Sequence, residues 1–375
     1  MRNGLAAASV VGSLLLLPTG AQAAAPDFGF VRGVTVGPIE NARHAHKGYG
    51  SPACARTMAD LRRMGASWVS LTPFGRVADL QPTGIDMSFE APFEVNRRAV
   101  LDAMRQAHAE GLRVFLVPHL WVESGDWRAR IDPGTDEGWE RWAKAYERFV
   151  LAWAEVAQEG GADLFSVGVE LRSWVTTTRV RSFFPILDAI RHVYRGPLTY
   201  SANWDDVEDT ILLGELDVIG INAFYPLAER EGVSFDELYR GGERVASRVR
   251  ELASTWNKPV LFTEMGYTTR PDPALRPWEW PDGMRDVTID EPAQAEAYLA
   301  LLAPLLDEPA FAGFFAWRVY ADPRDVSQEA EWGFSPRGKL AELVLRDAFA
   351  TWWARDDGFL RGFPVKGRAR TPGIF

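Results

Sequence analysis

The sequence predicts an α/β fold, a single (β/α)8 TIM barrel. Eight short apolar segments alternate with helix-like segments along the chain, which is the pattern of parallel strands joined by helices. No glycine-rich phosphate turn follows the first of these strands, which disfavours the alternative, an open doubly wound sheet. The 375 residues suffice for one barrel with long loops. No shift in composition marks a second folded domain.

The first four strands are apolar runs that alternate with three well-delimited helices. Ser51 and Pro52 supply an N-cap and a first-turn proline, and Gly65 ends that helix. Tryptophans at helical spacing, among them Trp142 and Trp153, predict packing positions on the third helix. The expected strands cover 30–36, 67–74, 113–119 and 163–171, and the expected helices cover 51–64, 93–110 and 137–158.

The second half of the chain repeats this rhythm. A helix that ends at Tyr194 precedes the fifth strand, and a helix that starts near Glu291 precedes the eighth. Trp278 lies in a long loop over 268–288. The remaining strands are expected at 198–203, 216–222, 259–267 and 312–317, and two further helices at 235–255 and 340–354.

The N-terminus has the pattern of a secretory signal. Arg2 precedes an apolar run over 5–17, and Ala21-Gln-Ala23 supplies an A-x-A cleavage site. The apolar run is too short for a stable membrane span. We therefore expect three segments: a signal peptide over 1–23, a catalytic domain over 24–355, and an irregular C-terminal tail over 356–375. The mature chain should be secreted or periplasmic, without a membrane span.

Composition excludes several classes of function. A formal net charge of -10 and the absence of a basic arm argue against nucleic-acid binding. Cys54, the single cysteine, cannot form an internal disulfide and is expected to be a small buried hydrophobe. Five histidines without paired spacing predict no metal site, and no other cofactor is expected. We expect a monomer whose partner is a carbohydrate substrate.

Two of the buried strands end on a glutamate. Glu264 ends the run that begins at Pro259, and Glu170 ends the run that begins at Asp163. Barrels of this kind keep their chemistry at the carboxyl ends of the strands, so both side chains should face one cleft. Two facing carboxylates are the minimum apparatus for cleaving a glycosidic bond. A single strand-end glutamate would more often form a structural ion pair, so the matched pair is the specific signal.

Other strand ends carry the groups that a sugar ring requires. Amides and imidazoles can hydrogen-bond hydroxyl groups, and exposed aromatic faces can stack on the C–H face of a pyranose. Core packing is the alternative role for the tryptophans. The candidate substrate-binding residues are His119, Trp121, Asn203, Trp204, Asn222, Tyr225 and Trp317.

The chain resembles the clan A glycoside hydrolases and, more closely, glycoside hydrolase family 113, whose characterised members are retaining β-mannanases. The resemblance extends over 30–353 and is strongest at 166–171, 220–225, 262–267 and 315–317. It implies that Glu170 is the acid/base and Glu264 the nucleophile. It also implies that Tyr225 hydrogen-bonds the nucleophile and that Trp317 forms the floor under the cleaved sugar.

The sequence departs from this pattern at Val169. Many clan members carry asparagine there, where it binds the sugar 2-hydroxyl group. The contact is then left to Asn203 or Asn222, or the sugar preference differs. A retaining hydrolase acting on β-mannan is the leading hypothesis. The alternatives are a β-glycosidase of other specificity and a non-catalytic carbohydrate-binding barrel. Glu170 is flanked by apolar Gly168, Val169 and Leu171, so we expect it to be the desolvated, protonated member of the pair.

Overall fold

The computed structural model describes residues 29–37, 47–89, 91–279, 287–324, 329 and 331–356. Within these ranges, eight strands pair in parallel and close into a barrel, as predicted. They are β1 (Val31–Gly37), β2 (Trp68–Leu71), β4 (Arg113–Leu116), β6 (Leu164–Val169), β7 (Leu198–Asn203), β8 (Ile219–Asn222), β9 (Val260–Met265) and β10 (Phe311–Tyr320). Their order round the barrel is β1-β10-β9-β8-β7-β6-β4-β2.

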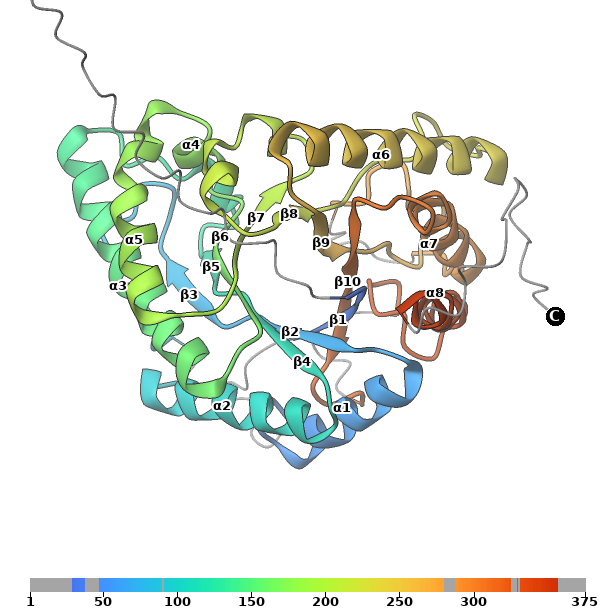
Figure 1. Ribbon diagram of the computed structural model, residues 1–375, viewed down its shortest axis with the longest axis horizontal. Coiled ribbons are helices and arrows are strands. Elements are labelled where there is room, and N and C mark those ends of the chain that lie inside the picture. The colour runs from blue at the N-terminus through green and yellow to red at the C-terminus, as the bar shows by residue number, and fades with distance from the viewer. Residues whose placement is uncertain are drawn as a thin grey trace, which may run out of the picture.

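Helices surround the strands on the outside of the barrel (Figure 1). The longer ones are α1 (Pro52–Met64), α2 (Phe93–Ala109), α3 (Asp136–Gly160), α5 (Phe184–Val193), α6 (Phe235–Trp256), α7 (Glu291–Leu305) and α8 (Leu340–Asp356). The short ones are α4 (Arg172–Val175) and the 3-10 turns η1 (Arg128–Arg130), η2 (Thr178–Ser182), η3 (Val207–Asp209) and η4 (Ile211–Glu215). Among the described residues, none of these helices is both long and apolar enough to cross a bilayer.

The helix boundaries follow the local chemistry that the sequence predicts. The Ser51 side chain accepts a hydrogen bond from the backbone N–H of Cys54 at the start of α1, and Gly65 closes that helix in a left-handed conformation. Gly161 closes α3 in the same way. These caps satisfy backbone groups that a helix end leaves without partners. The strand and helix positions expected from the sequence are therefore confirmed, to within a few residues.

The hydrophobic core has two layers. A small inner cluster fills the barrel and includes Trp68, Phe115 and Phe315. A larger outer cluster fills the space between the strands and the surrounding helices, where Trp142 and Trp153 are fully buried on α3. Both tryptophans pack as the sequence predicts. Because each barrel strand is covered on both faces, it reads as an apolar run rather than an alternating one.

A two-stranded parallel sheet extends the barrel beyond β2 and β4. Its strands are β3 (Phe74–Val77) and β5 (His119–Val122), which continue the same two segments after Pro73 and Pro118. A proline has no backbone N–H to donate, so each position lacks a ladder donor, while the Pro73 carbonyl still accepts from the His119 N–H at 2.8 Å. The sequence patterns that marked 67–74 and 113–119 as single strands did not predict this extension.

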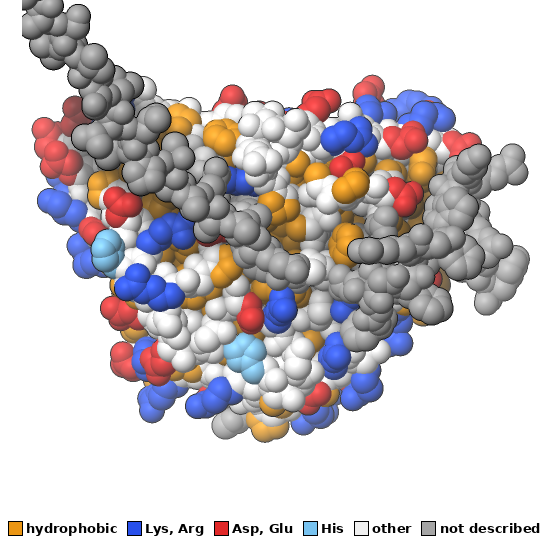
Figure 2. All heavy atoms as spheres, in the orientation of Figure 1, with side chains coloured by type: hydrophobic (Ala, Val, Ile, Leu, Met, Phe, Trp, Pro, Cys, Tyr) orange, Lys and Arg blue, Asp and Glu red, His pale blue; other side chains and the backbone are white. Residues whose placement is uncertain are grey.

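The predicted segments at the two ends are not covered by the structure. The signal peptide over 1–23 lies outside the described residues, and so does the tail from 357 onward. Asp356, the first residue of the expected tail, is the last residue of α8. Figure 2 shows charged side chains at the periphery of one face and hydrophobic side chains nearer its middle.

Candidate active site

Glu264 is aimed by an irregularity in strand pairing. Ile221 of β8 pairs with Phe262 of β9, but the next residue, Asn222, pairs with Glu264 rather than Thr263. The extra residue on β9 is a bulge, which changes the direction of the side chains that follow it. It brings Glu264 beside Asn222, near the carboxyl ends of both strands.

The surroundings of Glu264 disfavour its charged form. Its side chain is buried, and the pKa of its carboxyl group is raised well above 4.5, first by burial and then by the charge of Glu170. Three weaker influences lower the pKa: the charges of Arg128 and Arg318, and a hydrogen bond from Asn222. Burial thus favours the protonated form of Glu264, which is the opposite of the charged form expected for this member of the pair from the sequence.

Glu170 follows β6 directly and has a strained backbone. Its φ is 50°, in the left-handed region that side chains other than glycine seldom occupy. Its N–H donates to the Ser201 carbonyl at 2.9 Å, and the next N–H, of Leu171, donates to the Tyr200 hydroxyl at 2.5 Å. Such strain persists where surrounding contacts over-determine the conformation, and it is concentrated at functional sites.

Three side chains donate hydrogen bonds to the buried carboxylate of Glu170. Trp127 Nε1 and Arg128 Nη1 donate to Oε2 at 2.7 and 2.6 Å, and Asn222 Nδ2 donates to Oε1 at 3.0 Å. The expectation that Glu170 has apolar surroundings is therefore wrong. Its neighbours in sequence are apolar, but its neighbours in space come from a loop more than forty residues earlier in the chain.

Asn222 links the two carboxyl groups. It is fully buried at the end of β8, and its amide oxygen accepts a hydrogen bond from Thr263 Oγ1 at 2.9 Å. That bond fixes which end of the amide carries the donors. The nitrogen then donates to Glu170, and a hydrogen bond from Asn222 lowers the pKa of Glu264. Both predicted catalytic residues and Asn222 thus lie in one cluster.

His119 lies on the other side of Glu264. Its Nε2 is 3.1 Å from Glu264 Oε1, but neither atom makes a hydrogen bond with the described residues. Burial and then the charge of Arg128 lower the pKa of His119 well below 6.5, so the contact is not an ion pair. The imidazole stacks on the ring of Trp317, with centroids 6.0 Å apart. The structure brings His119 and Trp317 together beside the glutamates.

None of the remaining predicted aromatic residues forms a hydrogen bond with either glutamate among the described contacts. Trp121 is 46% exposed on β5. Trp204 follows β7 and stacks on Trp278, whose ring centroid is 5.4 Å away and which is also 46% exposed. Tyr225 packs against Trp204, and its buried hydroxyl makes no hydrogen bond with the described residues. The bond between Tyr225 and Glu264 that the family resemblance implies is thus not formed here.

Asn203 has a different partner from the one expected. Its amide nitrogen donates to the carboxylate of Asp205 rather than to either glutamate. Arg172 donates to both Asp205 and Asp206, the latter from Nε at 2.7 Å. Burial raises the pKa of Asp206 to about 6, against the opposing influence of Arg172. This acidic loop lies next to the site without contacting the reacting pair.

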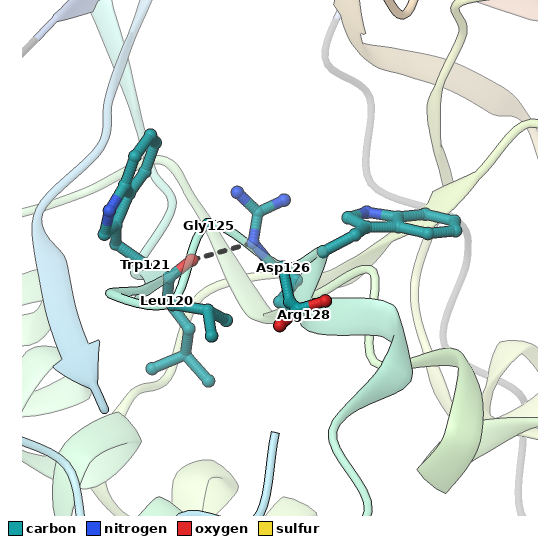
Figure 3. Close-up of a pocket in the computed structure, with 7 residues that line it drawn as sticks. Leu120, Trp121, Gly125, Asp126 and Arg128 are labelled. Carbon is teal, nitrogen blue, oxygen red and sulfur yellow. Dashed lines mark hydrogen bonds between the residues drawn. The ribbon is translucent and has the colours of Figure 1, made fainter. Parts of the chain in front are cut away.

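Trp127 and Arg128 were not predicted from the sequence. They end a segment over 120–128 that forms a small pocket, in which Arg128 turns back so that its Nε donates to the Leu120 carbonyl at 2.8 Å (Figure 3). No periodicity or motif distinguishes these residues from any other loop. The only available signal was their proximity to the end of a barrel strand. Among the described residues, no cluster of histidine, cysteine and carboxylate side chains could hold a metal ion.

A closed parallel barrel with two strand-end glutamates in one buried cluster, and an aromatic rim beside them, has the architecture of a barrel glycoside hydrolase. The comparisons with known proteins agree with this class. The model of Glycoside Hydrolase Family 113 matches residues 41–339, and the chain belongs to that family. A search of curated protein sequences gives no match.

Solved structures of this family and of another glycoside hydrolase family have similar folds. The GH113 β-mannanase AaManA from Alicyclobacillus acidocaldarius, in complex with ManMIm, is 26% identical, with a TM-score of 0.73 over 87% of this chain and 99% of its own. A GH113 β-1,4-mannanase in a complex is 22% identical, with a TM-score of 0.72 over 86% and 99%. A family 5 mannosidase from Rhizomucor miehei is 11% identical, with a TM-score of 0.62 over 88% and 95%.

Proposed function

We propose that this glycoside hydrolase cleaves β-linked mannan, or oligosaccharides derived from it, with retention of configuration. The observation that carries the proposal is the single buried cluster in which Asn222 lies between Glu170 and Glu264. Membership of family 113 and the likeness to a β-mannanase at 26% identity support the choice of substrate.

The proposed reaction has two steps. In the first, a Glu264 carboxylate oxygen bonds to the anomeric carbon while the glycosidic C–O bond breaks and the leaving oxygen takes a proton from Glu170. In the second, water bonds to the anomeric carbon, gives a proton to Glu170, and displaces Glu264. After the second step, both glutamates have returned to their starting forms.

Polar atoms beside Glu264 support binding of a polyhydroxylated ring. His119 Nδ1 and Nε2, and Glu264 Oε1, are buried without a hydrogen bond to any described residue. Buried polar groups in native proteins have partners, so such atoms are suited to the hydroxyl groups of a sugar. Val169 cannot contribute, because it packs in the apolar interior of the barrel.

The test is a substrate panel with a stereochemical readout. Mature protein is incubated with β-1,4-mannan, mannooligosaccharides, cellooligosaccharides and aryl β-glycosides, and proton NMR follows the first anomer released. We expect mannooligosaccharides to be cleaved fastest and the first product to be the β-anomer. An initial α-anomer contradicts retention, and faster cleavage of glucan contradicts the proposed substrate. Absence of turnover on the whole panel favours a carbohydrate-binding barrel.

We also propose that the enzyme acts outside the cytoplasm, from the signal pattern over residues 1–23. Mass spectrometry of the protein exported by its native host should find a new N-terminus near Ala24. An exported form that still carries Met1 contradicts cleavage.

A further inference from the structure

Trp127 and Arg128, adjacent residues on one loop, both donate to the same oxygen of Glu170. The distances to Oε2 are 2.7 Å from Trp127 Nε1 and 2.6 Å from Arg128 Nη1. Both ionic partners are largely shielded from water, since the side chain of Arg128 is 17% exposed and that of Glu170 is 8% exposed. Charge-assisted hydrogen bonds of this length are about twice as strong as neutral ones.

Contacts on both sides keep this pair in place. Arg128 Nε donates to the Leu120 carbonyl at 2.8 Å, which anchors the guanidinium to the end of the barrel extension. The guanidinium of Arg172 lies 4.9 Å from the centre of the Trp127 ring. Arg172 is itself held by ion pairs with Asp205 and Asp206. The two donors are therefore preorganised rather than free to swing away from Glu170.

We propose that Trp127 and Arg128 are positioning residues that hold Glu170 in the orientation and carboxylate form required by the second step of the reaction. This inference rests on the proposed function, because the two steps of that reaction require opposite protonation states of Glu170. The first step needs a proton on Glu170, and the second needs its carboxylate to receive one from water. Donors aimed at a carboxylate stabilise its charged form, so the pair assists the second step and opposes the first.

Other charged and titratable groups also face Glu170, and the test must account for them. Four such groups interact electrostatically with Glu170: His119 on β5, Tyr200 on β7, Asp206 just after β7, and Glu264 on β9. None of the four donates a hydrogen bond to the Glu170 carboxylate among the described contacts, whereas Arg128 does.

The direct test does not require turnover. Protein carrying carbon-13 at the glutamate side-chain carboxyls is titrated by NMR, and the Glu170 signal is assigned by its loss in Glu170→Gln. We expect Arg128→Met to move the midpoint of this signal up by about 1 pH unit or more, and Trp127→Phe to move it less. Arg128→Lys, which keeps the charge, should move it less than Arg128→Met.

Arg130→Met is the matched control. Arg130 lies on the same 3-10 turn, but it pairs with Asp126 at 3.6 Å and is 68% exposed. We expect no movement of the Glu170 signal in this variant. An unmoved signal in Arg128→Met, in a protein that keeps the wild-type melting temperature, overturns the inference. If Arg128→Met does not fold, Trp127→Phe and Arg128→Lys decide, and two unmoved signals overturn it.

Kinetics separate this inference from the proposed function. With an activated aryl glycoside, the first step needs no acid, so Arg128→Met should show a burst of product followed by slower turnover. With a mannooligosaccharide, the loss of activity at high pH should begin about 1 pH unit later than in the wild type. An equal fall on both substrates without these changes overturns the positioning role. A wild type that cleaves neither substrate contradicts the proposed function, while the NMR titration still decides this inference.

Discussion

Glu170 and Glu264 are the same residue type at the same end of one barrel, yet their surroundings are opposite in kind. Three fixed donors hold the carboxylate of Glu170. Glu264 is buried beside a neutral imidazole, with one oxygen that no described residue hydrogen-bonds. The neighbours of Glu264 come mainly from barrel strands, whereas two of the three donors to Glu170 come from a loop. The barrel thus shields Glu264 from water, and the loop places the charge of Arg128 beside Glu170.

Replacing the two glutamates is the largest test of this comparison. Glu264→Ala should lower turnover by about 10⁴-fold or more on every substrate, because no covalent intermediate can form. Glu170→Ala should lower cleavage of mannooligosaccharides by about 10²- to 10⁴-fold but spare the first step with activated aryl glycosides. Steady-state and burst kinetics on both substrates measure this difference.

Added azide identifies which glutamate has which role. In Glu264→Ala, azide should restore cleavage of an activated aryl glycoside and give a glycosyl azide of inverted configuration. In Glu170→Ala, the azide product should retain the configuration of the substrate. Reversal of the two outcomes would reverse the roles assigned to the glutamates. Full activity in both variants would exclude the pair as the catalytic groups.

The pH dependence of kcat/KM tests the Glu264 side. Because the pKa of Glu264 is raised well above 4.5, its carboxylate forms only as the pH rises through that higher value. The acid limb of kcat/KM should therefore lie above pH 4.5. Asn222→Ala removes a hydrogen bond that lowers this pKa, so the limb should move to higher pH.

Asn203→Ala is the control for that shift. Asn203 pairs with Asn222 across β7 and β8, but its amide donates to Asp205. The acid limb should stay in place in this variant. A limb that moves equally in both variants would show that the change is not specific to the amide beside Glu264.

Asp206 gives a smaller effect, on stability. Its pKa is about 6 in the folded protein and 3.8 ordinarily, so the stability it contributes is complete below 3.8 and is lost as the pH rises through about 6. As the pH rises from about 4 to about 7.5, the free energy of unfolding of Asp206→Asn should therefore increase relative to that of the wild type, by at most about 3 kcal/mol. Water near Arg172 will reduce that figure. Denaturant unfolding at both pH values measures it, and a difference that does not change with pH contradicts the prediction.

Thr263→Val is expected to have the smallest effect. It leaves the amide oxygen of Asn222 buried without the hydrogen bond at 2.9 Å, which should cost about 1–2 kcal/mol in the free energy of unfolding. Because the bond also fixes the amide orientation, kcat should fall while the fold is kept. Thermal unfolding and kinetics on a mannooligosaccharide check both effects, and wild-type values for both would show that the amide is oriented by other contacts.

The sequence was informative wherever a property is local along the chain. Apolar runs and helix caps predicted the barrel, and runs that end on Glu170 and Glu264 predicted the carboxyl pair. The donors to Glu170 could not be predicted in this way, because Trp127 and Arg128 reach it only through the path of a loop. The same limit applies to Asn203. The residues around it in the sequence do not indicate whether its amide binds a sugar hydroxyl group or, as in the structure, the carboxylate of Asp205.

Pro73 and Pro118 interrupt two neighbouring strands at the same height, so the barrel and its extension meet at a joint where neither proline can donate a ladder hydrogen bond, although the Pro73 carbonyl accepts one from the His119 N–H at 2.8 Å. One side of the joint is the barrel with its two glutamates, and the other side carries Trp121 and the loop that leads to Arg128. The register is the same on both sides of the joint, with Leu71 opposite Leu116 before it and Phe74 opposite His119 after it. Three residues past Pro118 link the two parts: His119 lies 3.1 Å from Glu264, and Trp127 and Arg128 donate hydrogen bonds to Glu170. The wall around Trp121 can therefore be altered without disturbing the two glutamates only where His119, Trp127 and Arg128 stay in place.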